Sequence, residues 1–153
     1  MKTAMKDDPV IRLFLQTAQA IEDRLETALE GVELSVAKYS ALKQLALADE
    51  PLSFSELAAR LVCVRSNVSQ LVDRLEADCL VRRVEDPRDR RCMRADLTDL
   101  GRERHAAGAR RMETVRGGIV EILSEVDRGV LERALEKLRG SGLPGGDPRS
   151  AKG

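Results

Sequence analysis

Hydrophobic residues recur three and four positions apart in six segments of the chain, which is the spacing of helices that bury one face. We expect these helices over residues 10–29, 35–48, 53–61, 65–77, 99–123 and 127–139. The stripe of the first helix fits a seam between two chains as well as a core within one chain. Gly31 follows that stripe and is expected to end the helix.

Short polar residues mark where several of these helices begin. Ser35 and Thr98 each precede a periodic segment and are typical N-caps, because their hydroxyls accept a hydrogen bond from the first turn. Ser53 and Glu56 have the spacing of a capping box at the start of the third helix. The inward positions expected here include Ala46 and Ala58. The larger inward positions are Tyr39, Leu42, Leu45, Leu57 and Leu61.

The fourth helix, over residues 65–77, divides into an apolar and a polar face. Its apolar stripe consists of Val68, Leu71, Val72 and Leu75. Opposite that stripe lie Ser66, Gln70, Asp73 and Arg74, with Asn67 and Ser69 at its edges. Two short helices joined by a tight turn, the second of them polar on its outer face, form a helix-turn-helix pattern.

The period then changes to that of strands. Residues 80–84 and 92–97 predict two short strands, and the charged segment 85–91 between them contains a proline that favours a turn. The fold class is therefore mainly α with a small β-hairpin wing, in a winged helix-turn-helix arrangement. The Gly-, Pro- and Ser-rich segment 140–153 is expected to be a disordered tail.

Composition and charge narrow the function classes. Hydrophobic residues make up 42% and charged residues 34% of the 153 positions, as in a globular protein, and aromatic residues only 2%, which favours helices over β-sandwiches. The net charge is zero, but residues 80–95 carry six arginines against three acidic residues. The absence of a long apolar run and the three unpaired cysteines predict a cytoplasmic protein without a membrane partner.

The polar helix face and the basic hairpin together predict binding to double-stranded DNA. Gln70 can pair with an adenine edge, and Arg74 or Arg65 can reach guanine or phosphate in the major groove. Arginines at the hairpin tip can enter the minor groove, while Asp89 is expected to pair with Arg91 or a neighbour and direct the turn. The expected DNA-binding residues are Arg65, Ser66, Asn67, Ser69, Gln70, Arg74, Arg88, Arg90 and Arg91.

The order of these elements and their motifs resemble the MarR family of transcriptional regulators. The motifs that carry the resemblance are LAARL (57–61), VSQLVDRLEADCLVRR (68–83), EDPRDRR (85–91) and ADLTDLG (95–101). The resemblance implies a homodimer whose recognition helices enter successive major grooves of a pseudo-palindromic operator, about 34 Å apart. It implies a helical dimerisation region as well, with a dimerisation helix in residues 1–34, the DNA-binding region in 35–97 and dimerisation helices in 98–139. It also implies a wing arginine at Arg91 or Arg90, stabilised by Asp89. The chain departs from the family at Cys79, where glycine is usual and a positive φ is expected.

The remaining chemistry leaves alternatives open. Cys63, Cys79 and Cys92 are either small buried residues or candidate redox sensors, with the arginines around Cys92 expected to favour its thiolate. A small-molecule effector is the other candidate signal, in a pocket that Tyr39, Phe14, Phe54 and Met112 could line.

No cofactor, metal site or enzymatic activity is expected. His105, the only histidine, is expected to be a partly exposed helix residue. A winged-helix module that binds protein instead of DNA is the alternative function.

Overall fold

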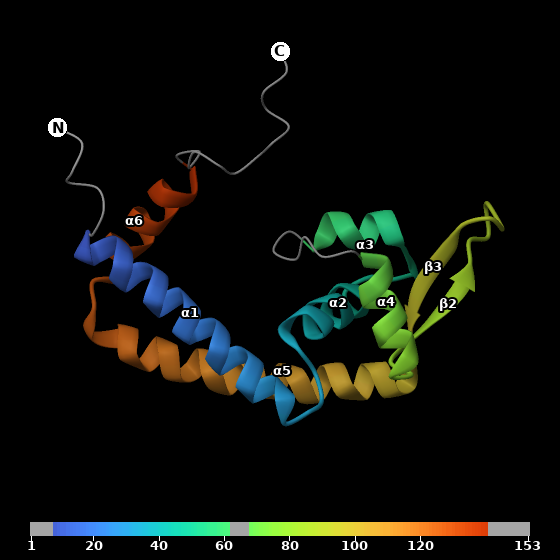
Figure 1. Ribbon diagram of the computed structural model, residues 1–153, viewed down its shortest axis with the longest axis horizontal. Helices are drawn as coiled ribbons and strands as arrows, with labels where there is room; N and C mark the ends of the chain where they lie inside the picture. Colours follow the sequence, from blue (N-terminus) through green and yellow to red (C-terminus); the bar gives the residue numbers. More distant parts are fainter. Residues whose placement is uncertain (1–7, 62–67, 141–153) are drawn as a thin grey trace, which may run out of the picture. The chain divides into compact units, whose positions relative to one another are not determined.

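The computed structural model of the protein describes residues 8–61 and 68–140, which form six helices and a small antiparallel sheet (Figure 1). The helices are α1 (Pro9–Glu30), α2 (Val36–Ala46), α3 (Phe54–Arg60), α4 (Val68–Ala77), α5 (Asp99–Ile122) and α6 (Arg128–Gly140), with a short 3₁₀ turn at Leu123–Glu125. The strands are β1 (Leu52–Ser53), β2 (Val81–Glu85) and β3 (Met93–Leu97). The predicted fold class, mainly α with a β-hairpin wing, is confirmed.

The chain divides into two compact units, residues 1–115 and residues 116–153, and α5 continues from the first into the second. The expected disordered tail, 140–153, is wrong at its first residue, since Gly140 is the last residue of α6, and 141–153 lie outside the described residues. Within the described ranges, no helix combines the length and apolar character that a membrane crossing requires.

The core of the first unit is aliphatic, as the composition requires. It joins α2, α3 and α4 to the inner face of the sheet, and its fully buried large side chains are Leu29, Leu42, Leu57, Leu75, Leu80, Val72 and Val81. Two predicted core positions are wrong: Ala46 and Ala58 are exposed. Each lies about 100° around its helix from a buried leucine, at the edge of the buried face, and Ala46 is also the last residue of α2.

The predicted helix N-caps are all confirmed. Ser35 Oγ accepts a hydrogen bond from Lys38 N at 3.2 Å. Ser53 and Glu56 form the complete capping box, with Ser53 Oγ accepting from Glu56 N at 3.1 Å and Glu56 Oε2 accepting from Ser53 N at 2.7 Å. Thr98 Oγ1 accepts from Gly101 N at 2.9 Å at the start of α5.

Helix α1 ends at Glu30 with Gly31 as its C-cap, as the sequence predicts. Gly31 has an ordinary helical φ of −63°, and the left-handed residue that turns the chain lies two positions later, at Glu33, with φ 55°. Leu34 N donates to Leu29 O and Glu33 N to Glu30 O, which is the Schellman arrangement at a helix C-terminus. Arg104 of α5 holds this corner, because its guanidinium donates to Val32 O at 3.1 Å and to the Glu33 carboxylate at 2.6 Å.

The end of α4 carries the conformation that the sequence predicts for Cys79. Its φ is 60°, its N–H donates to Glu76 O, and the N–H of Leu80 donates to Leu75 O, so α4 also ends in a Schellman motif. A side chain other than glycine is strained in this region of backbone space by about 1–2 kcal/mol. The recognition helix therefore ends at a strained residue.

The Leu-Thr-x-x-Gly segment, residues 97–101, joins the turn at Cys79 and Leu80 to α5. Thr98 Oγ1 donates to Cys79 O at 2.7 Å and Thr98 N donates to Leu80 O at 3.2 Å. Gly101 lies against the same corner, where a Cβ atom would collide with the carbonyl oxygen of Leu80. The motif thus requires threonine for the paired hydrogen bonds and glycine for the close approach of two backbones.

The sheet has the strand order β1–β3–β2, and the sequence predicted only the β2–β3 pair. That pair runs in register from Val81 opposite Leu97 to Glu85 opposite Met93. The missed strand, β1, has two residues, with Ser53 opposite Arg94. A two-residue strand is too short to show a hydrophobic period, so only its partner reveals it.

Candidate DNA interface

Helix α4 presents a polar face to solvent and fixes its apolar face to the core. Leu71, Val72 and Leu75 are buried, whereas Ser69, Gln70 and Arg74 are exposed. The first residues expected at the DNA, Arg65, Ser66 and Asn67, lie outside the described residues, as does Cys63. The described part of α4 therefore has the division of faces that a groove-entering helix needs.

An ion-pair cluster fastens α4 to the wing strand β2. Arg83 of β2 pairs with Asp73 and has its Nε 3.2 Å from the Glu76 carboxylate, and its guanidinium carbon lies 5.5 Å from the centre of the Phe54 ring. Asp73 belongs to the polar face that the sequence predicts and would repel phosphate if it were unpaired. Arg83 offsets that charge and connects α3, α4 and the wing.

Two aspartates shape the wing loop between β2 and β3. Asp86 Oδ1 accepts from Arg88 N at 2.8 Å, and Asp89 Oδ1 accepts from Arg91 N at 3.0 Å. Both are turns in which an aspartate accepts from the N–H two residues later. The sequence predicts a pairing of Asp89 with Arg91, and the structure makes it through the main chain of Arg91.

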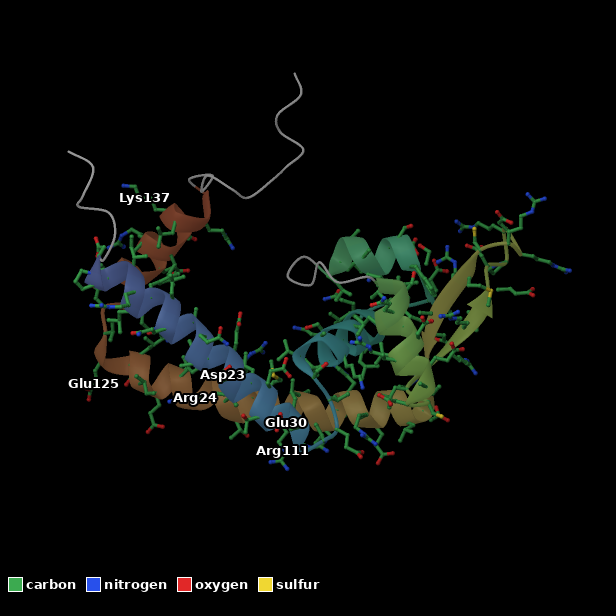
Figure 2. All side chains as sticks on the ribbon, viewed as in Figure 1. Asp23, Arg24, Glu30, Arg111, Glu125 and Lys137 are labelled. Carbon is green, nitrogen blue, oxygen red and sulfur yellow. The ribbon has the colours of Figure 1, made fainter. Side chains whose placement is uncertain are left out.

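The tip of the wing is cationic. Arg88, Arg90 and Arg91 are exposed, and within residues 8–61 and 68–140 their guanidinium groups form no ion pair. Figure 1 shows the hairpin extending past α4, and Figure 2 shows nitrogen atoms gathered at its loop. Unpaired guanidinium groups on a thin loop suit phosphates and a narrow minor groove.

Sequence reasoning missed Arg94 and Asp86, which are the least exposed charged residues of the wing. Their side chains are 13% and 11% exposed, and Arg94 Nε donates to Asp86 Oδ2 at 2.7 Å. The pKa of Asp86 is lowered, first by the N–H of Arg88 and then by Arg94. The only signal in the sequence was an aspartate and an arginine eight residues apart. Their contact depends on how β2 and β3 pair, and the sequence does not determine that register.

Cys79 and Cys92 are exposed free thiols, but Cys92 lacks the lowered pKa expected of a reactive thiol. Cys92 Sγ lies 3.6 Å from Asp89 Oδ2, and the pKa of this thiol is raised, mainly by the negative charge of Asp89 and then by partial burial. Arg94 acts in the direction that the sequence predicts, but Asp89 outweighs it, so the prediction of a favoured thiolate is wrong. Cys79 is also exposed and bears the positive φ described above.

The four residues expected to line an effector pocket do not share one environment. Tyr39 and Met112 belong to the buried core, Phe54 lies beneath Arg83, and Phe14 is 46% exposed. His105 stacks on Tyr39 with ring centres 5.6 Å apart. Burial and then the charge of Lys43 lower the pKa of His105, so its ring is neutral at pH 7. Among the described residues, no group of three or more metal-ligating side chains is suited to a metal ion.

A paired helix-turn-helix with a β-hairpin wing, followed by a long helix, defines the winged helix-turn-helix class. The model of the MarR family matches residues 33–91 of the chain. The resemblance that the motifs predict is thereby confirmed for this stretch, which is less than half of the chain. The solved structures that resemble this chain include a MarR family transcriptional regulator.

One curated relative and two solved structures illustrate the similarity. An uncharacterized HTH-type transcriptional regulator, YkoM of Bacillus subtilis (strain 168), is 38% identical over 53 residues, which are 35% of this chain and about a third (34%) of that protein. Sco3205, a MarR family transcriptional regulator of Streptomyces coelicolor solved in complex with DNA, is 26% identical, with a TM-score of 0.76 over 97% of this chain and 95% of that one. CouR of Rhodococcus jostii RHA1, solved bound to p-coumaroyl-CoA, is 25% identical, with a TM-score of 0.70 over 93% and 97% of the two chains.

Proposed function

We propose that the protein is a sequence-specific, double-stranded-DNA-binding transcription regulator that acts as a homodimer on a pseudo-palindromic operator. The observation that carries the proposal is the pairing of two surfaces on one rigid core. Gln70 and Arg74 are exposed on α4, and Arg88, Arg90 and Arg91 are exposed and unpaired within the described residues at the wing tip. The first surface suits base edges and the second suits phosphates and the minor groove.

Exposed apolar side chains support the dimer. Near the start of α1, Val10, Leu13 and Leu15 are 74%, 64% and 62% exposed. In the other unit, α6 has no buried residue across 128–140, and Val130, Leu135 and Leu138 are 53%, 41% and 45% exposed. Apolar helix faces of this kind are covered in stable proteins, and a second copy of the chain would supply the cover.

We further propose that the regulator is a cytoplasmic repressor that a small molecule or an oxidant releases. The p-coumaroyl-CoA in the CouR structure supports a small-molecule effector, since that chain shares this fold. The raised pKa of Cys92 favours the small-molecule alternative over a thiolate sensor at that position.

Selection of bound sequences from a random pool of DNA duplexes tests the proposal. We expect an inverted repeat, with half-site centres about one helical turn apart. Replacing Arg90 and Arg91 together with alanine should weaken binding and reduce the dependence on salt, by a slope of about 0.9 for each phosphate that the variant no longer neutralises. The matched control is the double alanine variant of Arg102 and Arg110, two arginines of α5 that lie outside the proposed interface.

The alternative, a winged-helix module that binds protein, predicts a different result. Such a module would enrich no duplex sequence, and its weak binding to DNA would respond equally to the wing variant and to the α5 control. A protein that shows no salt-sensitive binding to any duplex would overturn the proposed function.

A further inference from the structure

The guanidinium of Arg94 connects three segments of the winged domain. Its Nε donates to Asp86 Oδ2 at 2.7 Å, and its Nη1 donates to Pro51 O at 2.8 Å and to Glu56 Oε2 at 3.0 Å. These partners belong to the wing loop, to the segment before β1 and to the first turn of α3, in that order. A single side chain from β3 thus reaches both the wing and the first helix of the helix-turn-helix.

Each carboxylate that Arg94 contacts also organises its own segment. Asp86 accepts from Arg88 N, and the N–H of Asp86 donates to Cys92 O at 2.9 Å, so this residue closes the wing loop at its base. Glu56 completes the capping box with Ser53. Arg94 therefore links the group that shapes the wing loop to the group that starts α3.

The charge state of the cluster is stable at neutral pH. The pKa of Glu56 is lowered first by the main-chain N–H of Ser53 and then by its hydroxyl, with further contributions from Arg94. The pKa of Asp86 is lowered by Arg88 N and by Arg94. Both carboxylates are ionised, and Arg94 offsets their charge instead of presenting its own charge to a ligand.

We propose that Arg94 is a positioning residue that sets the orientation of the wing relative to α3 and α4. The wing-tip arginines can act together with α4 only if the hairpin keeps a fixed direction. Beyond the two-residue pairing with β1, the hairpin is a two-stranded ribbon that can twist. Arg83 fixes β2 to α4, and the contacts from Arg94 to Asp86, Pro51 and Glu56 fix the wing loop to α3. The functional part of this inference rests on the proposed DNA binding, whereas its structural part does not.

Amide hydrogen exchange of the free protein tests the structural part. In Arg94→Leu we expect the amides of Arg88 and Cys92 to exchange about tenfold faster or more, because the Asp86 carboxylate loses its anchor. The matched control is Arg82→Leu, since Arg82 leaves the same face of the hairpin and pairs with Asp96 at 2.7 Å but contacts neither Asp86 nor α3. Unchanged exchange in Arg94→Leu, or equal acceleration in the control, would overturn the proposal.

A second pair of variants separates positioning from folding. Asp86→Asn keeps an oxygen that can accept from Arg88 N but loses the charge that holds Arg94, and Glu56→Gln keeps the capping box. Both should fold, and both should loosen the wing amides less than Arg94→Leu. Arg94→Lys should restore protection in part, because an ammonium can satisfy only some of the three acceptors that the planar guanidinium reaches.

Binding to the selected duplex then tests the functional part through a double-mutant cycle. We expect Arg94→Leu to weaken binding about tenfold and to lower the salt slope, as the Arg90/Arg91 alanine variant does, and the combined variant to be little worse than either. Additive losses would mean that Arg94 acts independently of the wing tip and would overturn the proposal. If Arg94→Leu accelerates amide exchange but the wild-type protein binds no duplex, the positioning role of Arg94 is retained and the proposed DNA binding is rejected.

Discussion

Cys79 offers a direct test of the strained end of α4. Its φ of 60° costs a side chain about 1–2 kcal/mol, and replacement by glycine removes this cost. Glycine also gives the unfolded chain more freedom, which costs about 0.5–1 kcal/mol. The side chain of Cys79 is exposed, and the bond from Thr98 is to its main-chain oxygen, so Cys79→Gly removes neither a buried side chain nor that bond. The net expectation is a stabilisation of about 0.5–1 kcal/mol.

Urea denaturation at one protein concentration measures this difference, because the stability of a dimer depends on concentration. Cys79→Ala is the control, since alanine removes the thiol but keeps the strain, and Cys79→Asn should lie between alanine and glycine. At slopes of about 1–3 kcal/mol per molar urea, the glycine variant should unfold at a midpoint a few tenths molar above that of alanine. Equal midpoints for glycine and alanine would refute the left-handed conformation at this position.

Three glycines and one thiol allow further tests. Gly101→Ala should destabilise the protein by about 3 kcal/mol or more in urea denaturation, because the added Cβ collides with the main-chain carbonyl of Leu80. A change in stability as small as that of an exposed Gly→Ala substitution would contradict the close approach of these two backbones. Gly117→Ala and Gly118→Ala should each stabilise α5 by up to about 1 kcal/mol, since both lie inside the helix with no atom within 4 Å of an added Cβ. A loss of stability would instead indicate that these glycines contact the second chain of the proposed dimer. The Cys92 thiol should react with iodoacetamide at about pH 8 more slowly than a free thiol, and Asp89→Asn should accelerate it because the negative charge that raises its pKa is gone; unchanged rates would refute that cause.

The sequence predicted those parts of the fold whose signals are local. Helix positions follow from hydrophobic spacing, and the N-caps at Ser35, Ser53 and Thr98 follow from hydroxyls next to the first turn. Where a distant residue takes part in the conformation, local reasoning was incomplete. Gly31 was correctly expected to end α1, but the sequence did not predict the left-handed turn at Glu33, whose carboxylate is held by Arg104 from 71 residues later. Strand β1 is likewise defined only by its pairing with β3.

The candidate site shows the same limit. The exposure of Gln70 and Arg74 follows from the helical wheel, and the exposure of the wing arginines follows from a charged loop between two strands. The environment of Cys92 was misjudged because the charges of the nearby aspartates, which outweigh that of Arg94, were left out. In the folded loop, the group that reaches its sulfur is the Asp89 carboxylate three residues earlier, while the guanidinium of Arg94 is occupied by Asp86 and Glu56.

The zero net charge of the chain is compatible with an anion-binding surface, because ion pairs in the winged region neutralise many of its acidic side chains. Asp73 and Glu76 face Arg83, Asp86 and Glu56 face Arg94, Asp96 pairs with Arg82, and Asp78 pairs with Lys38. These pairs fix strands to helices and contribute little field at a distance, since opposite charges in contact largely cancel each other. Arg74 of α4 and the three wing-tip arginines form no ion pair within the described residues, so their charge faces solvent. The net charge of the chain therefore does not describe the surface of α4 and the wing tip. Because the carboxylates named above pair with basic partners, positive charge remains where the proposed DNA would lie.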